Sequence, residues 1–268
     1  MKKYLKVGAF VLSLALTAWI IYLTDIFTGY PISYFVVKNA SNKYIEENYQ
    51  GTDFIADKPE HSIKLGGFTV YVSSPSSADS HFSLKFDNRG NLQFDSYESD
   101  VVLRGNTARR LSNEYKKLSR AVFESSAFPF ESTFSADFQD AISGESEARM
   151  CPGTYPCKWD IKELVLDKEY DISQLSGEYG SINLDVTSDS VSVKTAAQSL
   201  LEIKKIMEKA NLPFKSVELW VLSKGKNEYE RPKESIHILN FGWDDIYSEN
   251  LEERIQDAID ETNKFYNK

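Results

Sequence analysis

The chain has 268 residues, of which 41% are hydrophobic and 26% are charged, close to the averages for globular domains. This composition provides enough apolar surface to offset the entropy of folding, so a largely disordered chain is not expected. The formal net charge is −9, and three of the 31 basic residues precede residue 7, which leaves 28 basic against all 40 acidic residues in the rest. Because such an acidic chain repels phosphate backbones, nucleic acid is excluded as a partner.

The N-terminal segment is apolar and follows a basic start. Val7 to Leu23 form an uncharged run of 17 residues after three lysines. This pattern predicts a cytoplasmic tail over residues 1–6 and a transmembrane anchor over residues 7–27. The predicted localisation is the cell membrane, single-pass, with the bulk of the chain extracytoplasmic. A cleaved secretory signal is the alternative, but the run is longer than usual for a signal and no small-residue cleavage site follows it.

Residues 31–125 have the pattern of a first α+β domain. Apolar residues at helical spacing predict a helix directly after Pro31. Three runs then alternate between apolar and polar residues, which predicts an antiparallel meander: Phe68/Val70/Val72, Phe82/Leu84/Phe86 and Leu92/Phe94. Asn106 is a suitable cap for a second helix, whose apolar stripe is Leu111, Tyr115, Leu118 and Val122.

Residues 126–180 lack a sustained period and are interpreted as a connector that contains a cysteine loop. From residue 181 to residue 268 the pattern predicts a second domain in the order β-α-β-β-α. The expected fold class is α+β: a transmembrane helix followed by two small α+β domains, each an antiparallel sheet packed with helices.

Several stretches between residues 30 and 125 resemble one known family. They are Asn39-Ala40-x-x-Lys43-Tyr44-Ile45-x-x-Asn48-Tyr49, Asp79-x-His81-Phe82, Asp95-x-Tyr97-Glu98-Ser99 and Gly105-Asn106-Thr107-x-x-Arg110-Leu111. In these residues the chain is similar to the YfjL-like family, membrane-anchored and mostly uncharacterised proteins of Gram-positive bacteria. The resemblance implies a location and a fold but no reaction.

Cys151 and Cys157 enclose a segment with two prolines and a glycine. Outside the cytoplasm this spacing predicts a disulfide that closes a small loop. A redox site is less favoured because the C-x-x-C spacing is absent, and a zinc site would need two further ligands nearby.

Asp79 and His81 are a conceivable polar site, although a surface turn is the simpler interpretation. The sequence contains no H-E-x-x-H, no G-x-S-x-G and no Gly-rich phosphate loop. We therefore expect no catalytic residue, no metal site and no cofactor.

A basic segment stands out in this acidic chain as a possible anion or partner surface: Arg104, Arg109, Arg110, Lys116, Lys117 and Arg120. The favoured alternative is that these side chains pair with Asp95, Glu98 and Asp100 just upstream. The function expected from the sequence is a non-catalytic, membrane-tethered extracytoplasmic module that binds or senses an envelope component or a partner protein. A cell-envelope hydrolase with a carboxylate-based site is the alternative.

Overall fold

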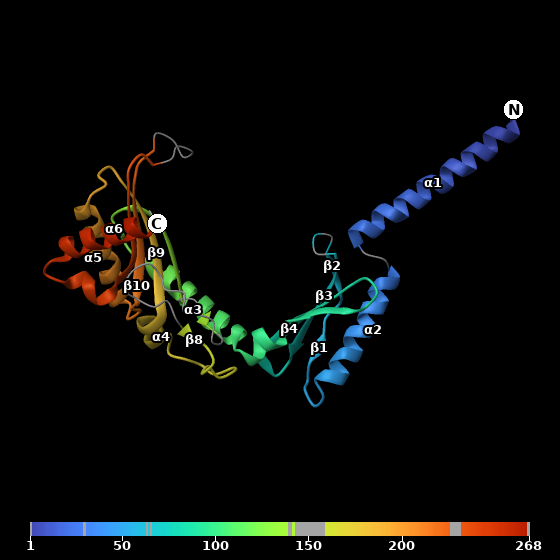
Figure 1. Cartoon of the computed structure of the whole chain (residues 1–268), viewed down its shortest axis with the longest axis horizontal. Helices are drawn as coiled ribbons and strands as arrows, with labels where there is room; N and C mark the ends of the chain where they lie inside the picture. Colours follow the sequence, from blue (N-terminus) through green and yellow to red (C-terminus); the bar gives the residue numbers. More distant parts are fainter. Residues whose placement is uncertain are drawn as a thin grey trace. The chain divides into compact units, whose positions relative to one another are not determined.

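The computed structural model describes residues 2–28, 31–62, 64, 66–138, 141–142, 159–225 and 232–266. It is a mixed α+β structure with a five-stranded sheet, a four-stranded sheet and a two-stranded sheet (Figure 1). The chain divides into two compact units, residues 1–106 and residues 107–268. Each unit contains one of the two larger sheets.

The predicted transmembrane helix requires a correction. Helix α1 covers Lys2–Thr28. Among the residues that the structure describes, no helix is long and apolar enough to cross a membrane. A hydrocarbon core needs about 20 consecutive apolar residues, whereas the uncharged run from Val7 to Leu23 has 17.

The first unit contains α1, a second long helix and an antiparallel sheet. Its elements after α1 are α2 (Pro31–Asn48), β1 (Ile55–Ala56), β2 (Glu60–Ser62), β3 (Gly67–Ser74), β4 (Ser77–Phe86), β5 (Leu92–Asp95) and the π-helix η1 (Glu98–Val102). The sheet order is β1-β3-β4-β5, and β2 also pairs with β3. The three alternating runs of the sequence lie in β3, β4 and β5, and their apolar residues in β3 and β4 are buried on one face.

The loop between β4 and β5 depends on a glycine. Asp87 Oδ1 accepts hydrogen bonds from the backbone N–H groups of Arg89 and Asn91, and Gly90 has a φ of 82°. A Cβ atom at Gly90 would lie 2.8 Å from Cγ1 of Val36 on α2. Glycine therefore permits both the positive φ and the close approach of the loop to the helix.

A shared carboxylate joins α2 to the end of the sheet. Asp95 Oδ2 accepts hydrogen bonds from the hydroxyl groups of Tyr44 (2.9 Å) and Tyr49 (2.5 Å). Its other oxygen accepts the backbone N–H of Tyr97 at 2.8 Å. Burial, followed by the hydrogen bond to Asp95, raises the pKa of both tyrosines. These four residues are among those that carry the family resemblance, and they meet in this contact.

The second unit is built around the four-stranded sheet. Its elements are α3 (Gly105–Glu124), β6 (Glu131–Phe138), β7 (Ala141–Ile142), β8 (Trp159–Asp160), α4 (Ile172–Tyr179), β9 (Gly180–Ser188), α5 (Val193–Lys209), β10 (Ser216–Ser223), β11 (Ser235–Gly242), the 3-10 helix η2 (Trp243–Tyr247) and α6 (Leu251–Tyr266). The strand order is β11-β10-β9-β6. The elements from β9 to α6 follow the β-α-β-β-α order expected from the sequence.

The sequence pattern predicts an antiparallel sheet in this domain, but the observed sheet is mixed. Strands β9 and β10 are parallel because α5 connects them and returns the chain to the same end of the sheet. Strand β6, which lies in the segment interpreted as a connector, pairs antiparallel with β9. Alternation of apolar residues indicates a strand but not the direction of its neighbour.

Helix α3 belongs mainly to the second unit, although the sequence analysis placed it in the first domain. Leu111 and Tyr115 are fully buried in the second core. The Tyr115 ring stacks on Phe138 with centroids 5.0 Å apart, and the Phe123 ring stacks on Phe134 at 4.4 Å. Because both partners lie on β6, the position of α3 depends on a strand that the sequence analysis did not identify.

One face of the four-stranded sheet is covered by helices. The inward residues of β9 and β10 are fully buried: Ile182, Leu184, Val186, Val217, Leu219 and Val221. Helices α5 and α6 lie on the same side of this sheet (Figure 1). The opposite face carries polar and aromatic residues such as Asp185 and Trp220, which are partly exposed.

Two adjacent leucines of α5 provide a test of this packing. Leu200 is fully buried, whereas 37% of Leu201 is exposed. We expect Leu200→Ala to lower the free energy of unfolding by about 2–5 kcal/mol because it leaves a cavity. The matched change Leu201→Ala should cost less than about 1 kcal/mol. Chemical denaturation followed by circular dichroism measures both, and equal effects would contradict the assigned burial.

The tyrosine pair on Asp95 predicts a loss of stability at alkaline pH. The folded chain keeps the protons of Tyr44 and Tyr49, whereas the unfolded chain releases them near the ordinary tyrosine pKa of about 10. The unfolded state then binds fewer protons, so the free energy of unfolding falls as pH rises through about 10.

Replacing both Tyr44 and Tyr49 by Phe should reduce this alkaline decline between about pH 8 and about pH 10.5. The exposed Tyr71 serves as the control, and Tyr71→Phe should leave the decline unchanged. Denaturation curves at the two pH values measure the difference. An unaltered decline in the double variant would contradict the shared hydrogen bond.

Candidate functional site

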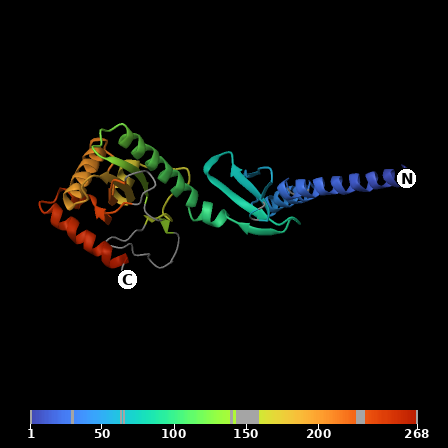
Figure 2. The same cartoon turned by 90° about the horizontal axis from the view of Figure 1, so that it is seen from above.

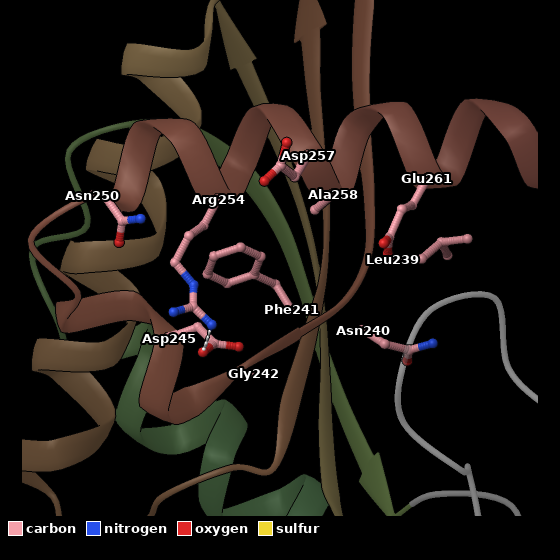
Figure 3. Close-up of a pocket in the computed structure, with 10 residues that line it drawn as sticks. All are labelled: Leu239, Asn240, Phe241, Gly242, Asp245, Asn250, Arg254, Asp257, Ala258 and Glu261. Carbon is pink, nitrogen blue, oxygen red and sulfur yellow. Dashed lines mark hydrogen bonds and ion pairs between the residues drawn. The ribbon is translucent and has the colours of Figure 1, made fainter.

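A groove of about 370 Å³ lies between the edge strand β11 and helix α6. Its lining is mostly polar (Figure 3), and the described residues in it are Leu239, Asn240, Phe241, Gly242, Asp245, Asn250, Arg254, Asp257, Ala258 and Glu261. The volume falls within the range of small-ligand sites in proteins. We take this groove as the candidate functional site.

Helix α6 supplies one wall of the groove because its two faces differ. Leu251 and Ile255 are buried in the core at a spacing of one turn. The residues that line the groove are also spaced by about one turn but on the neighbouring face: Asn250, Arg254, Asp257 and Glu261. The helical period therefore places an amide, a guanidinium and two carboxylates along one side.

Strand β11 supplies the second wall, and it is irregular there. Pairing with β10 shifts register between Val217 and Leu219, and Asn240 has a φ of 49°. Asparagine is among the residues that tolerate this left-handed conformation best. The backbone N–H of Leu239 donates to Thr262 Oγ1 of α6 at 3.3 Å, which joins the strand to the helix beside the groove.

The end of the groove is formed by η2, which a buried lysine holds in place. Lys204 of α5 is 4% exposed, and its Nζ donates to the carbonyl oxygen of Trp243 at 2.8 Å. The ammonium group also lies 4.7 Å from the ring centroid of Trp243 and 3.9 Å from that of Tyr247. Burial lowers the pKa of Lys204. These contacts fix the short helix that carries Asp245.

An ion pair crosses the groove. The Arg254 side chain extends from α6 past the ring of Phe241 and forms a hydrogen bond to Asp245 Oδ1 (Figure 3). The Arg254 side chain is 44% exposed and that of Asp245 is 20% exposed. With Asp257 and Glu261 included, the lining has three carboxylates and one cation. The groove is therefore acidic even after the ion pair forms.

The chemistry that these residues offer is electrostatic. None of the described lining residues is a serine, a cysteine or a histidine, the usual nucleophiles and proton-transfer groups. Among the described parts of the chain, no group of three or more His, Cys, Asp or Glu residues could hold a metal ion. Carboxylates that line an open groove are suited to holding a cationic group.

A second polar group lies on the other face of the sheet. His237 Nε2 is 2.8 Å from Glu218 Oε1, and the His237 ring stacks on Trp220 with centroids 3.7 Å apart. The hydrogen bond from His237 lowers the pKa of Glu218. Burial, and then the charge of Glu218, raises the pKa of Asp185. Sequence pattern alone does not connect these residues because they come from three different strands.

The structure places the basic residues predicted as an anion or partner surface in several local environments. Arg104 has a φ of 66°, and its Nη1 donates to the carbonyl of Val101 at 2.7 Å. Arg110 donates to the carbonyl of Lys168 at 3.1 Å, while Arg109 is exposed. The remaining three line a shallow hollow of about 420 Å³ on α3: Lys116, Lys117 and Arg120.

For Lys116, the structure gives an ion-pair partner other than the acids just upstream of the segment. Lys116 pairs with Asp137 of β6 at 3.0 Å. Asp95 accepts the two tyrosine hydroxyls of the first unit, and Asp100 Oδ2 accepts the hydroxyl of Ser96 at 2.6 Å. The acceptor on β6 was not considered because that strand was not predicted.

Asp79 and His81, the other predicted polar site, lie on β4 with different environments. The Asp79 side chain is buried, with 1% of the residue exposed, whereas His81 is exposed. His81 Nδ1 lies 3.0 Å from the carbonyl oxygen of Ala78. Asn106 donates to the carbonyl oxygens of both Asp79 and His81, so this region joins the start of α3 to the sheet.

The predicted disulfide joins Cys151 and Cys157, and both cysteines lie outside the described residues. The spacing of two cysteines shows that a bridge is sterically possible, but it does not position the sulfur atoms.

The groove itself was missed by the sequence analysis. Its only sequence signal is the spacing of Asn250, Arg254, Asp257 and Glu261 along α6. A polar stripe of this kind is typical of any solvated helix face. The bulge at Asn240 and the position of η2 are needed to turn the stripe into one wall of a groove.

Comparison with known proteins identifies the family in both halves of the chain. Residues 1–96 match the model of the YfjL-like N-terminal domain, and residues 137–256 match that of the YfjL-like C-terminal domain. The first match lies within the first compact unit and the second within the second. No curated protein and no solved structure matches the chain. The chain therefore belongs to the YfjL-like family.

Proposed function

We propose that this chain is a binding protein whose second unit holds a basic segment of a partner polypeptide in the groove between β11 and α6. The observation that carries the proposal is the charge of the lining. Asp257 and Glu261 face the groove without an ion-pair partner among the described residues, while Arg254 already engages Asp245. A cationic side chain from a partner would satisfy the two remaining carboxylates.

Arg254 provides an internal example of such binding. Its guanidinium group reaches a carboxylate of η2 while its aliphatic stem passes the ring of Phe241 (Figure 3). Arginine stems commonly cover apolar surface while their heads form charged hydrogen bonds. A lysine or arginine from another chain could use the same combination at Asp257 and Glu261.

The shape of the groove favours a polypeptide over a small molecule that must be enclosed. The groove lies at an edge of the four-stranded sheet, and β11 has no further strand beside it among the described residues. Segments of a partner protein commonly bind in grooves between a sheet edge and a helix. The open side of the groove allows the flanking residues of a segment to continue in both directions.

The net charge of the chain also supports a basic partner. A formal charge of −9 attracts cationic segments over a distance, and acidic residues in the groove then fix their position. Binding through partly exposed carboxylates should weaken as salt rises, since counter-ions screen such contacts over about 10 Å at 0.1 M.

Removal of the two groove carboxylates is the direct test. A short fluorescein-labelled peptide of alternating Arg and Ser residues serves as the probe. We expect Asp257→Asn with Glu261→Gln to raise its Kd by about 5- to 30-fold, as measured by fluorescence anisotropy. The matched control is Glu252→Gln with Glu253→Gln, which removes two exposed carboxylates of α6 outside the groove lining. Equal weakening in the two double variants would contradict the groove as the site.

Removal of the internal cation should have the opposite effect. Arg254→Met keeps much of the apolar stem beside Phe241 but releases Asp245 and makes the groove more negative. We expect the Kd of the same basic peptide to fall by about 3- to 10-fold. Thermal unfolding of the variant checks that the groove persists. Weaker binding by a normally folded variant would show that Arg254 contributes to the site and would count against the proposal.

A further inference from the structure

Helices α3 and α6 lie at opposite sides of the second unit (Figure 2). Helix α3 packs on β6 through the stacked pairs Tyr115–Phe138 and Phe123–Phe134. Helix α6 packs beside β11, and Thr262 contacts the backbone of Leu239 there. Since β6 and β11 are the two edge strands of the sheet, one of these helices lies at each end of the helical layer.

The exposed faces of the two helices carry charged stripes with the same spacing. Each stripe uses steps of four, three and four residues, which keeps its members in line over three turns. The stripe of α3 consists of Asn113, Lys117, Arg120 and Glu124, and that of α6 consists of Glu253, Asp257, Asp260 and Lys264. All of these residues are exposed.

The two stripes are complementary when the helices run side by side in the same direction. Lys117 then lies level with Asp257, and Arg120 with Asp260. Glu124 lies level with Lys264, so the order of signs reverses on both helices together. One turn before Lys117 and Asp257, Glu114 lies level with Arg254. In this register, no two residues of like charge lie level with each other along α3.

The central charges of both stripes are available for such a contact. Among the described residues, Lys117, Arg120, Asp257 and Asp260 form no ion pair. A chain of net charge −9 repels other copies at a distance, so an attraction between copies requires a local match of this kind. Surface ion pairs are individually weak, which makes the contact reversible and sensitive to salt.

We propose that α3 of one copy packs in parallel against α6 of a second copy of this chain. The contact joins two different surfaces, so it is heterologous and leaves one α3 and one α6 open at the ends of each assembly. Association therefore increases with concentration rather than ending at a symmetric dimer. The inference goes beyond the proposed function because the contact forms without a ligand in the groove, and since both use Asp257, a ligand in the groove competes with Lys117 of the second copy.

The test uses two variants that preserve net charge and leave the groove residues unchanged. The first is Arg120→Glu with Glu124→Lys, and the second is Asp260→Lys with Lys264→Glu. Either variant alone places like charges opposite one another at two positions, whereas an equal mixture of the two restores opposite charges. Sedimentation velocity of the full chain at about 50 mM and about 300 mM salt measures association.

We expect the unaltered chain to associate at low salt and to dissociate at high salt. Each variant alone should show an association constant lower by about tenfold or more, and the mixture should recover it. The control is Glu202→Lys with Lys205→Glu, which exchanges an ion pair on α5 and should have no effect. Persistent association of either variant, a mixture that fails to recover, or a chain that is monomeric at every concentration would each overturn the proposal.

Peptide binding separates this inference from the proposed function. The first variant leaves every described residue of the groove unchanged and no longer occupies Asp257 in a contact between copies, so it should bind the basic peptide at least as tightly as the unaltered chain does. Loss of association with intact peptide binding supports the contact between copies. Intact association without peptide binding would instead reject the groove ligand and retain the contact. Thermal unfolding of each variant confirms that it is folded.

Discussion

Burial of one face of the four-stranded sheet is the constraint on which the second unit depends. The alternating residues of β9 and β10 present a continuous apolar surface that must be removed from water. Helices α3, α5 and α6 help to cover that surface. The apolar stripe of each helix determines which of its sides faces the sheet. The opposite face is left with polar and aromatic residues, including the contact between His237 and Glu218.

The candidate groove arises at the margin of this packing. Helix α6 buries Leu251 and Ile255 and thereby turns its neighbouring face towards the edge of β11. The buried ammonium of Lys204 then fixes η2 through one carbonyl and two rings. A lysine at this depth is costly unless its charge is satisfied, so the carbonyl and the rings are needed to hold it there. Asp245 owes its position on η2 to these contacts, and Arg254 reaches it from α6.

Much of the fold follows from local pattern. The period of two in Phe68, Val70 and Val72, or in Ile182, Leu184 and Val186, determines strands because only one face of each is buried. The apolar residues of α3, α5 and α6 recur with the helical period and predict these helices in the same way. Strand partners were less predictable: β6 has its apolar residues at Phe134, Ala136 and Phe138 in a segment otherwise rich in polar residues. Of the residues that carry the family resemblance, Tyr44, Tyr49 and Tyr97 meet at Asp95.

The sequence by itself determined the α+β class, the acidic balance and most of the helices and strands, because these depend on composition and on periods of two or 3.6 residues. The N-terminal run also suggested a membrane span, but no helix among the described residues is long and apolar enough to cross a membrane. Only the tertiary structure decided the pairing of β6, the unit to which α3 belongs and the acidic groove. These features depend on contacts between residues far apart in the chain, such as Lys204 with Trp243, and local patterns do not encode which distant residues meet.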